Sequence, residues 1–198
     1  SSDGSTIVSG DTTNKVTLWD AATGEMRREM QCGDSVRSVA LSSDGATIVS
    51  GDGSKVTLWD VASGEMRREI QCDGKVYSVA LSSDGATIVS GEDHNRVTLW
   101  DAATGEMWYE IQCGGKVLSV ALSTDGATIV IGDSSEKVTL WDAATGEKRR
   151  EIQCDSTVNG DVNSLALSSD GATIVSGDDS YKVTLWDAAT GEKRREMQ

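Results

Sequence analysis

Val16-Thr17-Leu18-Trp19-Asp20 is the first of five copies of one short sequence. The later copies occupy residues 56–60, 97–101, 138–142 and 183–187. Their tryptophans, spaced 40 to 45 residues apart, are Trp19, Trp59, Trp100, Trp141 and Trp186. A period of about 40 residues is typical of repeat proteins, whose units bury apolar surface against their neighbours. The repeat therefore predicts one extended unit over residues 1–198, and it favours an interaction surface over an enzyme.

The second repeat, residues 33–72, shows how one unit is built. We predict four short strands in it, over residues 36–42, 46–51, 55–60 and 65–72. The first three strands are rich in aliphatic and β-branched residues, so we expect neighbouring units to cover both of their faces. The fourth strand (EMRREIQC) is charged, which suits an exposed sheet edge. Four short antiparallel strands in each repeat describe one blade of a β-propeller.

The unit resembles the WD repeat over nearly the whole chain. The resemblance rests on the Ser-Asp-Gly turn at residues 43–45, on Ser50, and on VTLWD with the turn that follows it. Members of this family form circular β-propellers that act as scaffolds for other macromolecules. The resemblance implies an all-β propeller, or a fragment of one, with repeats over residues 1–32, 33–72, 73–113, 114–154 and 155–198. It also implies a non-enzymatic protein–protein interaction scaffold.

Two other functions fit the same residues. One is the regulatory WD-repeat portion of a larger signalling enzyme, and the other is a self-assembling or engineered propeller of closely similar repeats. Inner strands are predicted only over residues 36–42, 76–82, 117–123 and 162–168, so the first repeat lacks one. We therefore expect that further repeats of a longer chain, or another copy in a homo-oligomer, complete the ring.

The repeats lack the Gly-His pair that usually precedes the inner strand in the WD-repeat family, and Cys-Asp or Cys-Gly stands in its place. In the family, that histidine belongs to a His–Asp–Ser–Trp hydrogen-bond chain. We expect the bond from the Trp indole N–H to the Ser hydroxyl to survive here. The predicted pairs are Ser9–Trp19, Ser50–Trp59, Ser90–Trp100 and Ser176–Trp186. Ile131 replaces the serine in the fourth repeat, so Trp141 needs another acceptor or contact with water.

The repeats differ most where a partner would touch a propeller. The second residue of the inner strand varies, and it is Arg37, Tyr77, Leu118 or Asn163. The loop between the second and third strands also varies, as does the loop entering the inner strand, which is enlarged at residues 155–161. In an up-and-down blade these two loops share one rim, so we hypothesise a partner-binding surface there. Free drift of exposed loops is the alternative.

Trp108-Tyr109 is a second difference between the repeats, because the other four repeats have Arg-Arg at this position. Adjacent residues of a strand point to opposite sides of the sheet. We therefore expect at least one of the two rings to be exposed as an anchor for a protein partner. Packing of the pair against a neighbouring blade is the alternative interpretation.

The charge of the chain restricts its partners. The net charge is −14 at pH 7, which disfavours nucleic acid and anionic membrane surfaces, because both bind clusters of Lys and Arg. It favours protein partners with basic patches. The sequence has no apolar run near the roughly 18 residues of a membrane span.

The cysteines recur once per repeat, at Cys32, Cys72, Cys113 and Cys154. Equivalent positions in adjacent blades should lie beyond the roughly 7 Å Cα separation that a disulfide allows, and the Cys-x-x-Cys spacing of a zinc site is missing. We expect buried thiols in a reducing compartment, and hence a cytoplasmic protein. The single histidine, His94, lies in a polar loop, and the sequence predicts no catalytic, metal or cofactor site.

Overall fold

The strands pair in chain order into five antiparallel sheets, which we call blades 1 to 5. The computed structural model describes residues 1–154 and 160–198. The enlarged loop predicted over residues 155–161 therefore lies outside the described residues, apart from Gly160 and Asp161. The described residues form no helix that is long and apolar enough to cross a membrane.

The blades follow one plan. Blade 1 contains β1 (Thr6–Gly10), β2 (Lys15–Asp20) and β3 (Met26–Gln31). Blade 2 contains β4 (Val36–Leu41), β5 (Thr47–Asp52), β6 (Lys55–Asp60) and β7 (Met66–Gln71). Blade 3 contains β8 (Val76–Leu81), β9 (Thr87–Glu92), β10 (Arg96–Asp101) and β11 (Met107–Gln112). Blade 4 contains β12 (Val117–Leu122), β13 (Thr128–Asp133), β14 (Lys137–Asp142) and β15 (Lys148–Gln153). Blade 5 contains β16 (Val162–Leu167), β17 (Thr173–Asp178), β18 (Val183–Asp187) and β19 (Lys193–Met197).

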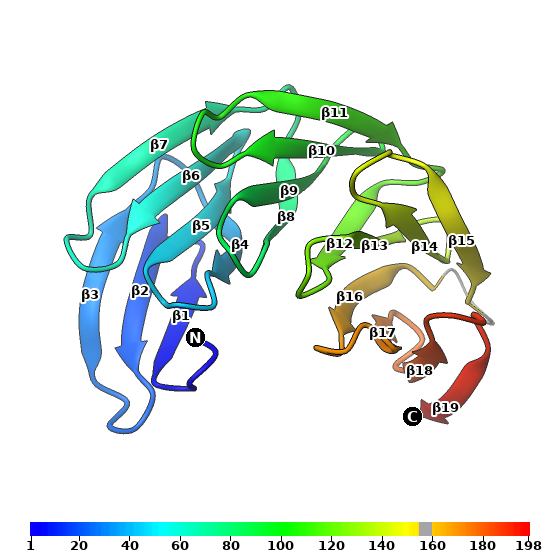
Figure 1. The fold of residues 1–198 in the computed structure, drawn as a ribbon. Helices are drawn as coiled ribbons and strands as arrows, with labels where there is room; N and C mark the ends of the chain where they lie inside the picture. Colours follow the sequence, from blue (N-terminus) through cyan, green and yellow to red (C-terminus); the bar gives the residue numbers. More distant parts are fainter. Residues whose placement is uncertain (155–159) are drawn as a thin grey trace.

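The blades stand side by side in an open arc (Figure 1). Their inner strands, β4, β8, β12 and β16, follow the inside of the arc, and the fourth strands lie along the outside. Each inner strand contacts the inner strand of the next blade. This arrangement confirms the predicted all-β propeller architecture, and blade 1 consists of three strands, as the sequence predicts.

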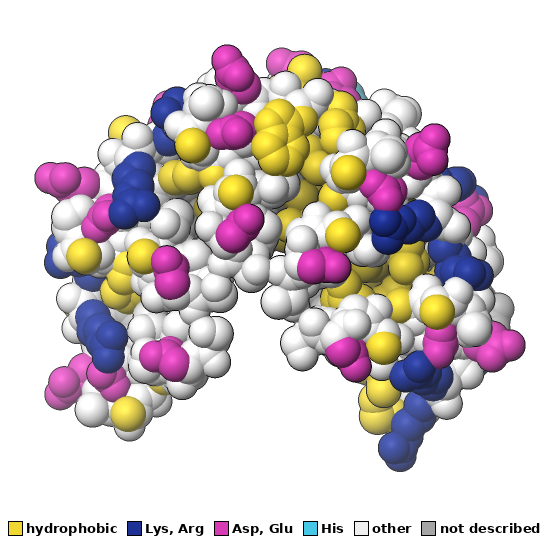
Figure 2. Space-filling view, in the orientation of Figure 1, with side chains coloured by type: hydrophobic (Ala, Val, Ile, Leu, Met, Phe, Trp, Pro, Cys, Tyr) yellow, Lys and Arg dark blue, Asp and Glu magenta, His cyan; other side chains and the backbone are white. Residues whose placement is uncertain are grey.

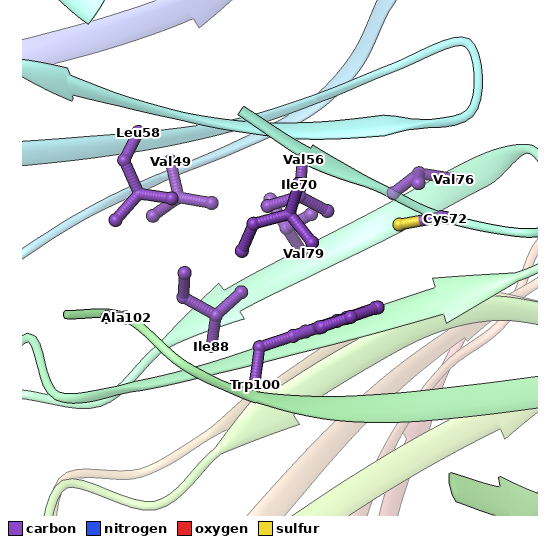
Figure 3. Packing of buried hydrophobic residues seen from close by; sticks show 10 residues of the cluster. All are labelled: Val49, Val56, Leu58, Ile70, Cys72, Val76, Val79, Ile88, Trp100 and Ala102. Carbon is purple, nitrogen blue, oxygen red and sulfur yellow. The ribbon is translucent and has the colours of Figure 1, made fainter. Parts of the chain in front are cut away.

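The core lies between adjacent blades. Between blades 2 and 3, Val56 and Ile70 face Ile88 and Trp100, and none of the four is more than 8% exposed (Figure 3). The fourth strands carry the charge, and Figure 2 shows Lys and Arg beside Asp and Glu along the outer side of the arc. A sheet whose inner strands are apolar on both faces needs a neighbouring blade on each side. The repeated sequence therefore folds as a stack of blades.

Glycines in the second strands allow the blades to pack closely. A Cβ atom at Gly51 would lie 2.6 Å from Val76 Cγ1 of the next blade, and one at Gly91 would lie 2.5 Å from Val117 Cγ1. Both distances are too short for carbon atoms that do not share a bond, so these positions exclude a side chain. In blade 5 the equivalent Gly177 is open, because a Cβ there would meet only Ser164, at 3.9 Å.

Serines on the inner strands join each blade to the next. Ser38 Oγ accepts the backbone N–H of Val79 at 3.0 Å, and Ser78 Oγ accepts that of Val120 at 3.0 Å. Ser119 repeats the contact between blades 4 and 5. These bonds satisfy a donor on the inner edge strand of the following blade, so neighbouring inner strands keep a fixed register around the arc.

A tryptophan–serine bond ties the second and third strands of four blades together. The indole N–H donates to the serine hydroxyl over 2.8–2.9 Å in the pairs Trp19–Ser9, Trp59–Ser50, Trp100–Ser90 and Trp186–Ser176. In blade 4 the indole of Trp141 donates instead to Thr139 Oγ1 at 2.8 Å. Thr139 lies opposite Ile131 in the β13–β14 pair, so it supplies the hydroxyl that Ile131 lacks.

Each cysteine directly follows a fourth strand, and Cys32 and Cys72 lie beside the serine of the next blade. Cys32 Sγ lies 3.9 Å from Ser50 Oγ, so the thiol extends the Trp59–Ser50 bond across the blade boundary. Burial raises the pKa of the Cys32 thiol to about 11 and that of Cys113 to about 12. Both groups are therefore protonated thiols at neutral pH, which suits a structural role.

Candidate partner-binding surface

Two kinds of loop meet at one end of the blades. We call this end the loop rim, and it carries the loops between second and third strands and the loops that enter the inner strands. Asp52, which ends β5, accepts the backbone N–H groups of Gly33 and Asp34, 3.0 and 3.3 Å away, just before β4. Burial raises the pKa of Asp52. The carboxylate thus fixes the two loops against each other.

The variable residue of each inner strand sits in a β-bulge at the loop rim. The register between the inner and second strands shifts around the second residue of β4, β8, β12 and β16. The bulged residues are Arg37, Tyr77, Leu118 and Asn163. A bulge leaves a residue out of the strand ladder and changes the direction of its side chain. The inner strands therefore differ in sequence at the residue that the bulge leaves out of the strand ladder.

Tyr77 lies between two cations from different blades. The Arg37 guanidinium carbon is 5.3 Å from the Tyr77 ring centroid, and Lys116 Nζ is 3.8 Å from it. Cations at these distances are attracted to the aromatic ring. The structure therefore brings together Arg37 and Tyr77, with Leu118 on the next inner strand. Sequence reasoning missed Lys116, although it lies one residue before β12, in a loop already marked as variable.

Blade 5 places two carboxylates at the loop rim near Asn163. Asn163 donates from Nδ2 to Asp179 Oδ1, so it is bound within its own blade and lies apart from the Tyr77 cluster. Burial raises the pKa of Asp161, and the Asp179 carboxylate raises it further, whereas Lys116 opposes the shift. Lys116 therefore interacts with the Tyr77 ring on one side and with the Asp161 carboxylate of blade 5 on the other.

Trp108 and Tyr109 lie at the opposite end of the blades from this cluster. We call that end the turn rim, because it carries the Ser-Asp-Gly turns and the turns between third and fourth strands. The Tyr109 ring packs into the core between blades 3 and 4, and its hydroxyl donates to the Ala143 carbonyl oxygen. Trp108 is 49% exposed. One ring packs against the next blade and the other faces solvent, and a partner contact of Trp108 stays a prediction.

The remaining polar residues play other parts. His94 is exposed in the β9–β10 loop, with a backbone φ of 65°. The aspartates of the Ser-Asp-Gly turns accept hydrogen bonds within those turns, as Asp44 does from Ser42 Oγ and from the N–H of Ala46. Over residues 1–154 and 160–198, the His, Cys, Asp and Glu side chains form no group of three or more that could hold a metal ion.

One comparison with known proteins identifies relatives of the whole chain. The family model described as NWD2 C-terminal beta-propeller matches residues 2–197. No curated protein sequence matches the chain. The family match covers all five blades, and it agrees with the sheets and their order around the arc.

Proposed function

The chain belongs to the NWD2 C-terminal beta-propeller family, and we propose on this premise that it is a non-enzymatic scaffold whose loop rim binds a protein partner. Propeller domains generally mediate protein interactions, which is the coarse function that family membership supports. The finer proposal places the contact surface at the loop rim, on the bulged residues of the inner strands. Buried thiols suit a reducing compartment, so the proposal includes a cytoplasmic location.

The observation that carries the proposal is the cluster of Arg37, Tyr77 and Lys116. Two bulged residues and a lysine of the loop before β12 converge from neighbouring blades on a rigid scaffold, and loops on such a scaffold are where binding residues commonly lie. Tyr and Arg are also the side chains most often found as anchors at protein interfaces. Their cations suit a carboxylate of the partner, and the carboxylates of Asp161 and Asp179 suit a basic residue further along the same segment.

Site-specific photo-cross-linking tests this surface. A photo-reactive residue in place of Leu118 should cross-link the partner, and one in place of the exposed Glu25, at the turn rim of blade 1, should not. The double variant Arg37→Ala with Tyr77→Ala should abolish the cross-link from position 118 while circular dichroism shows an intact fold. Equal cross-linking from both positions, or an unchanged cross-link in the folded double variant, would reject the loop rim.

Self-association is a second candidate, because blade 5 exposes residues that other blades bury. Val183 is 40% exposed and Met197 is 41% exposed, whereas their equivalents Val138 and Ile152 are 0% and 5% exposed. We propose that a second copy covers this face. Light scattering should detect the oligomer, and Val183→Lys should convert it to a monomer. A monomeric chain at high concentration would contradict this second candidate.

A further inference from the structure

Four blades bind an arginine of their own at the turn rim. The arginine near the start of the fourth strand donates from Nη2 to the aspartate that ends the third strand, in the pairs Arg27–Asp20, Arg67–Asp60, Arg149–Asp142 and Arg194–Asp187. The same guanidinium donates from Nη1 to a threonine hydroxyl, for example from Arg194 to Thr173 at 2.8 Å. Each blade therefore builds a guanidinium site from one aspartate and one threonine.

Blade 3 keeps the two acceptors of this site and replaces the arginine. Asp101 pairs with Thr87 across β9 and β10, as Asp60 pairs with Thr47 in blade 2. Trp108 occupies the bulge beside β10 at the register of the arginines, and its ring is 49% exposed. An indole cannot form the ion pair, so the acceptors of blade 3 lack the cation that the other blades provide.

The Asp101 carboxylate is partly engaged by its own turn. Oδ1 accepts the backbone N–H groups of Ala103 and Thr104 at 2.9 and 2.7 Å. Among the described residues, no lysine or arginine forms an ion pair with Asp101, in contrast to the aspartates of the other four blades. Oδ2, the oxygen that binds the guanidinium elsewhere, is therefore available to a cation from outside the chain.

The carboxylate is accessible from solvent. Asp101 lines a cleft of about 340 Å³ between blades 2 and 3, together with Arg68 and Ala103. The matching cleft between blades 4 and 5, of about 400 Å³, contains Arg194 next to Asp187. The two clefts share their other features, so the missing arginine is the main difference between them.

We propose that Asp101, Thr87 and Trp108 bind the arginine side chain of a basic partner segment. Asp101 Oδ2 and the Thr87 hydroxyl accept N–H groups of the guanidinium. The exposed indole of Trp108 stacks on the plane of the guanidinium. Arginine fits better than lysine, because its planar fork reaches two acceptors and stacks on an aromatic ring. The site lies at the turn rim, so it forms a second contact surface of the scaffold. The proposal for this site can therefore be wrong while the proposal for the loop rim is right.

The nearby Arg68 does not exclude a second guanidinium. Arg68 donates to the carbonyl oxygens of Ala103 and Thr104, both at 2.7 Å. In blade 2, Arg28 makes the same bonds to Ala62 and Ser63 beside the aspartate that binds Arg67. Two guanidinium groups next to one aspartate are therefore already part of this fold.

Titration with a blocked amino acid tests the proposal on the full chain. The probe is N-acetyl-L-arginine amide, and the readout is the indole N–H signal of Trp108 in a ¹⁵N–¹H NMR spectrum, assigned by its loss in Trp108→Arg. We expect a saturable shift of this signal alone among the six tryptophans. Asp101→Asn should weaken the affinity roughly tenfold or more, because a charged hydrogen bond is lost. The neutral isostere N-acetyl-L-citrulline amide should produce no saturable shift.

Two variants use the repeats as controls. Trp108→Arg restores the internal arginine and removes the reporting indole, so binding is followed there by the backbone N–H signals of Ala103 and Thr104, which contact Asp101. The folded variant should show no saturable shift of these signals. Arg67→Trp copies the blade 3 arrangement into blade 2 and should create a second responsive indole beside Asp60. The proposal is overturned if no saturable shift occurs up to about 0.1 M probe at constant ionic strength. It is also overturned if the citrulline probe shifts the Trp108 signal as the arginine probe does, or if the arginine probe binds Asp101→Asn as tightly as the parent chain. Neither outcome requires that Arg67→Trp folds.

Discussion

The hydroxyl of Tyr109 donates a hydrogen bond to the backbone carbonyl oxygen of Ala143, which joins blade 3 to blade 4. Arg68 connects blades 2 and 3 at the same turn, but one residue further along it, from Nη2 to the Ala103 carbonyl oxygen at 2.7 Å. A tyrosine thus replaces an arginine in one contact of a repeated set. Because both side chains bind a backbone carbonyl of the same turn in the next blade, the fold retains a contact there while the neighbouring residue, Trp108, diverges.

Tyr109→Phe removes this hydrogen bond and leaves the ring in place. We expect a loss of about 1 kcal/mol in the free energy of unfolding, measured by urea denaturation, because one carbonyl loses its partner at a half-buried position. Tyr109→Arg copies the side chain found in the other blades and should retain most of the stability. A Phe variant as stable as the parent chain would show that the bond contributes nothing.

The tryptophan–serine bond should matter most where it is buried. Trp59 is 6% exposed and its indole has Ser50 as acceptor at 2.9 Å, so Ser50→Ala should cost about 1–3 kcal/mol in the free energy of unfolding. Ser9→Ala removes the same bond from Trp19, which is partly exposed and can bond to water. Ser9→Ala should therefore lower the free energy of unfolding clearly less than Ser50→Ala. Equal losses in the two variants would contradict a role for burial.

The repeated sequence predicts the blades, because strands and turns recur with a fixed period. The Ser50–Trp59 pair is predicted by the resemblance to the WD repeat, in which a serine binds the tryptophan of the same blade. The contact of Lys116 with Tyr77 could not be predicted, because it depends on the separation of two blades. Thr139 as the acceptor for Trp141 was missed for another reason: the sequence favours no single substitute when Ile131 removes the usual serine.

Glycine at the blade boundary should be replaceable only at the end of the arc. Gly51→Ala places a methyl group 2.6 Å from the buried Val76 Cγ1, so we expect a loss of about 1–3 kcal/mol in the free energy of unfolding. Gly177→Ala, at the equivalent position of blade 5, meets only Ser164 and should leave the stability of the monomer nearly unchanged. Unfolding of both variants should be followed at a concentration at which the chain is monomeric. A severe loss in both would contradict the open face of blade 5.

Acid should weaken the fold through its aspartate–arginine pairs. The Arg149 guanidinium, and after it the backbone N–H of Thr145, lower the pKa of Asp142 to about 2. An aspartate in the unfolded chain takes up its proton near pH 3.9. Between about pH 4 and pH 2 the unfolded state therefore binds more protons than the folded state, so the free energy of unfolding falls as the pH falls.

Two asparagine variants separate the arginine from the turn in this pH dependence. Asp142→Asn should lower the unfolding midpoint at pH 7. Between pH 7 and pH 2 its midpoint should then fall less than that of the parent chain, because the group with the lowered pKa is gone. Asp101→Asn provides the control, since the pKa of Asp101 is lowered first by the N–H of Thr104, and Arg68 adds only the weakest attraction, without forming an ion pair. It should change the acid dependence less. Thermal unfolding midpoints from pH 7 to pH 2 measure both effects, and a midpoint that rises with acid in the parent chain would contradict the sign of the prediction.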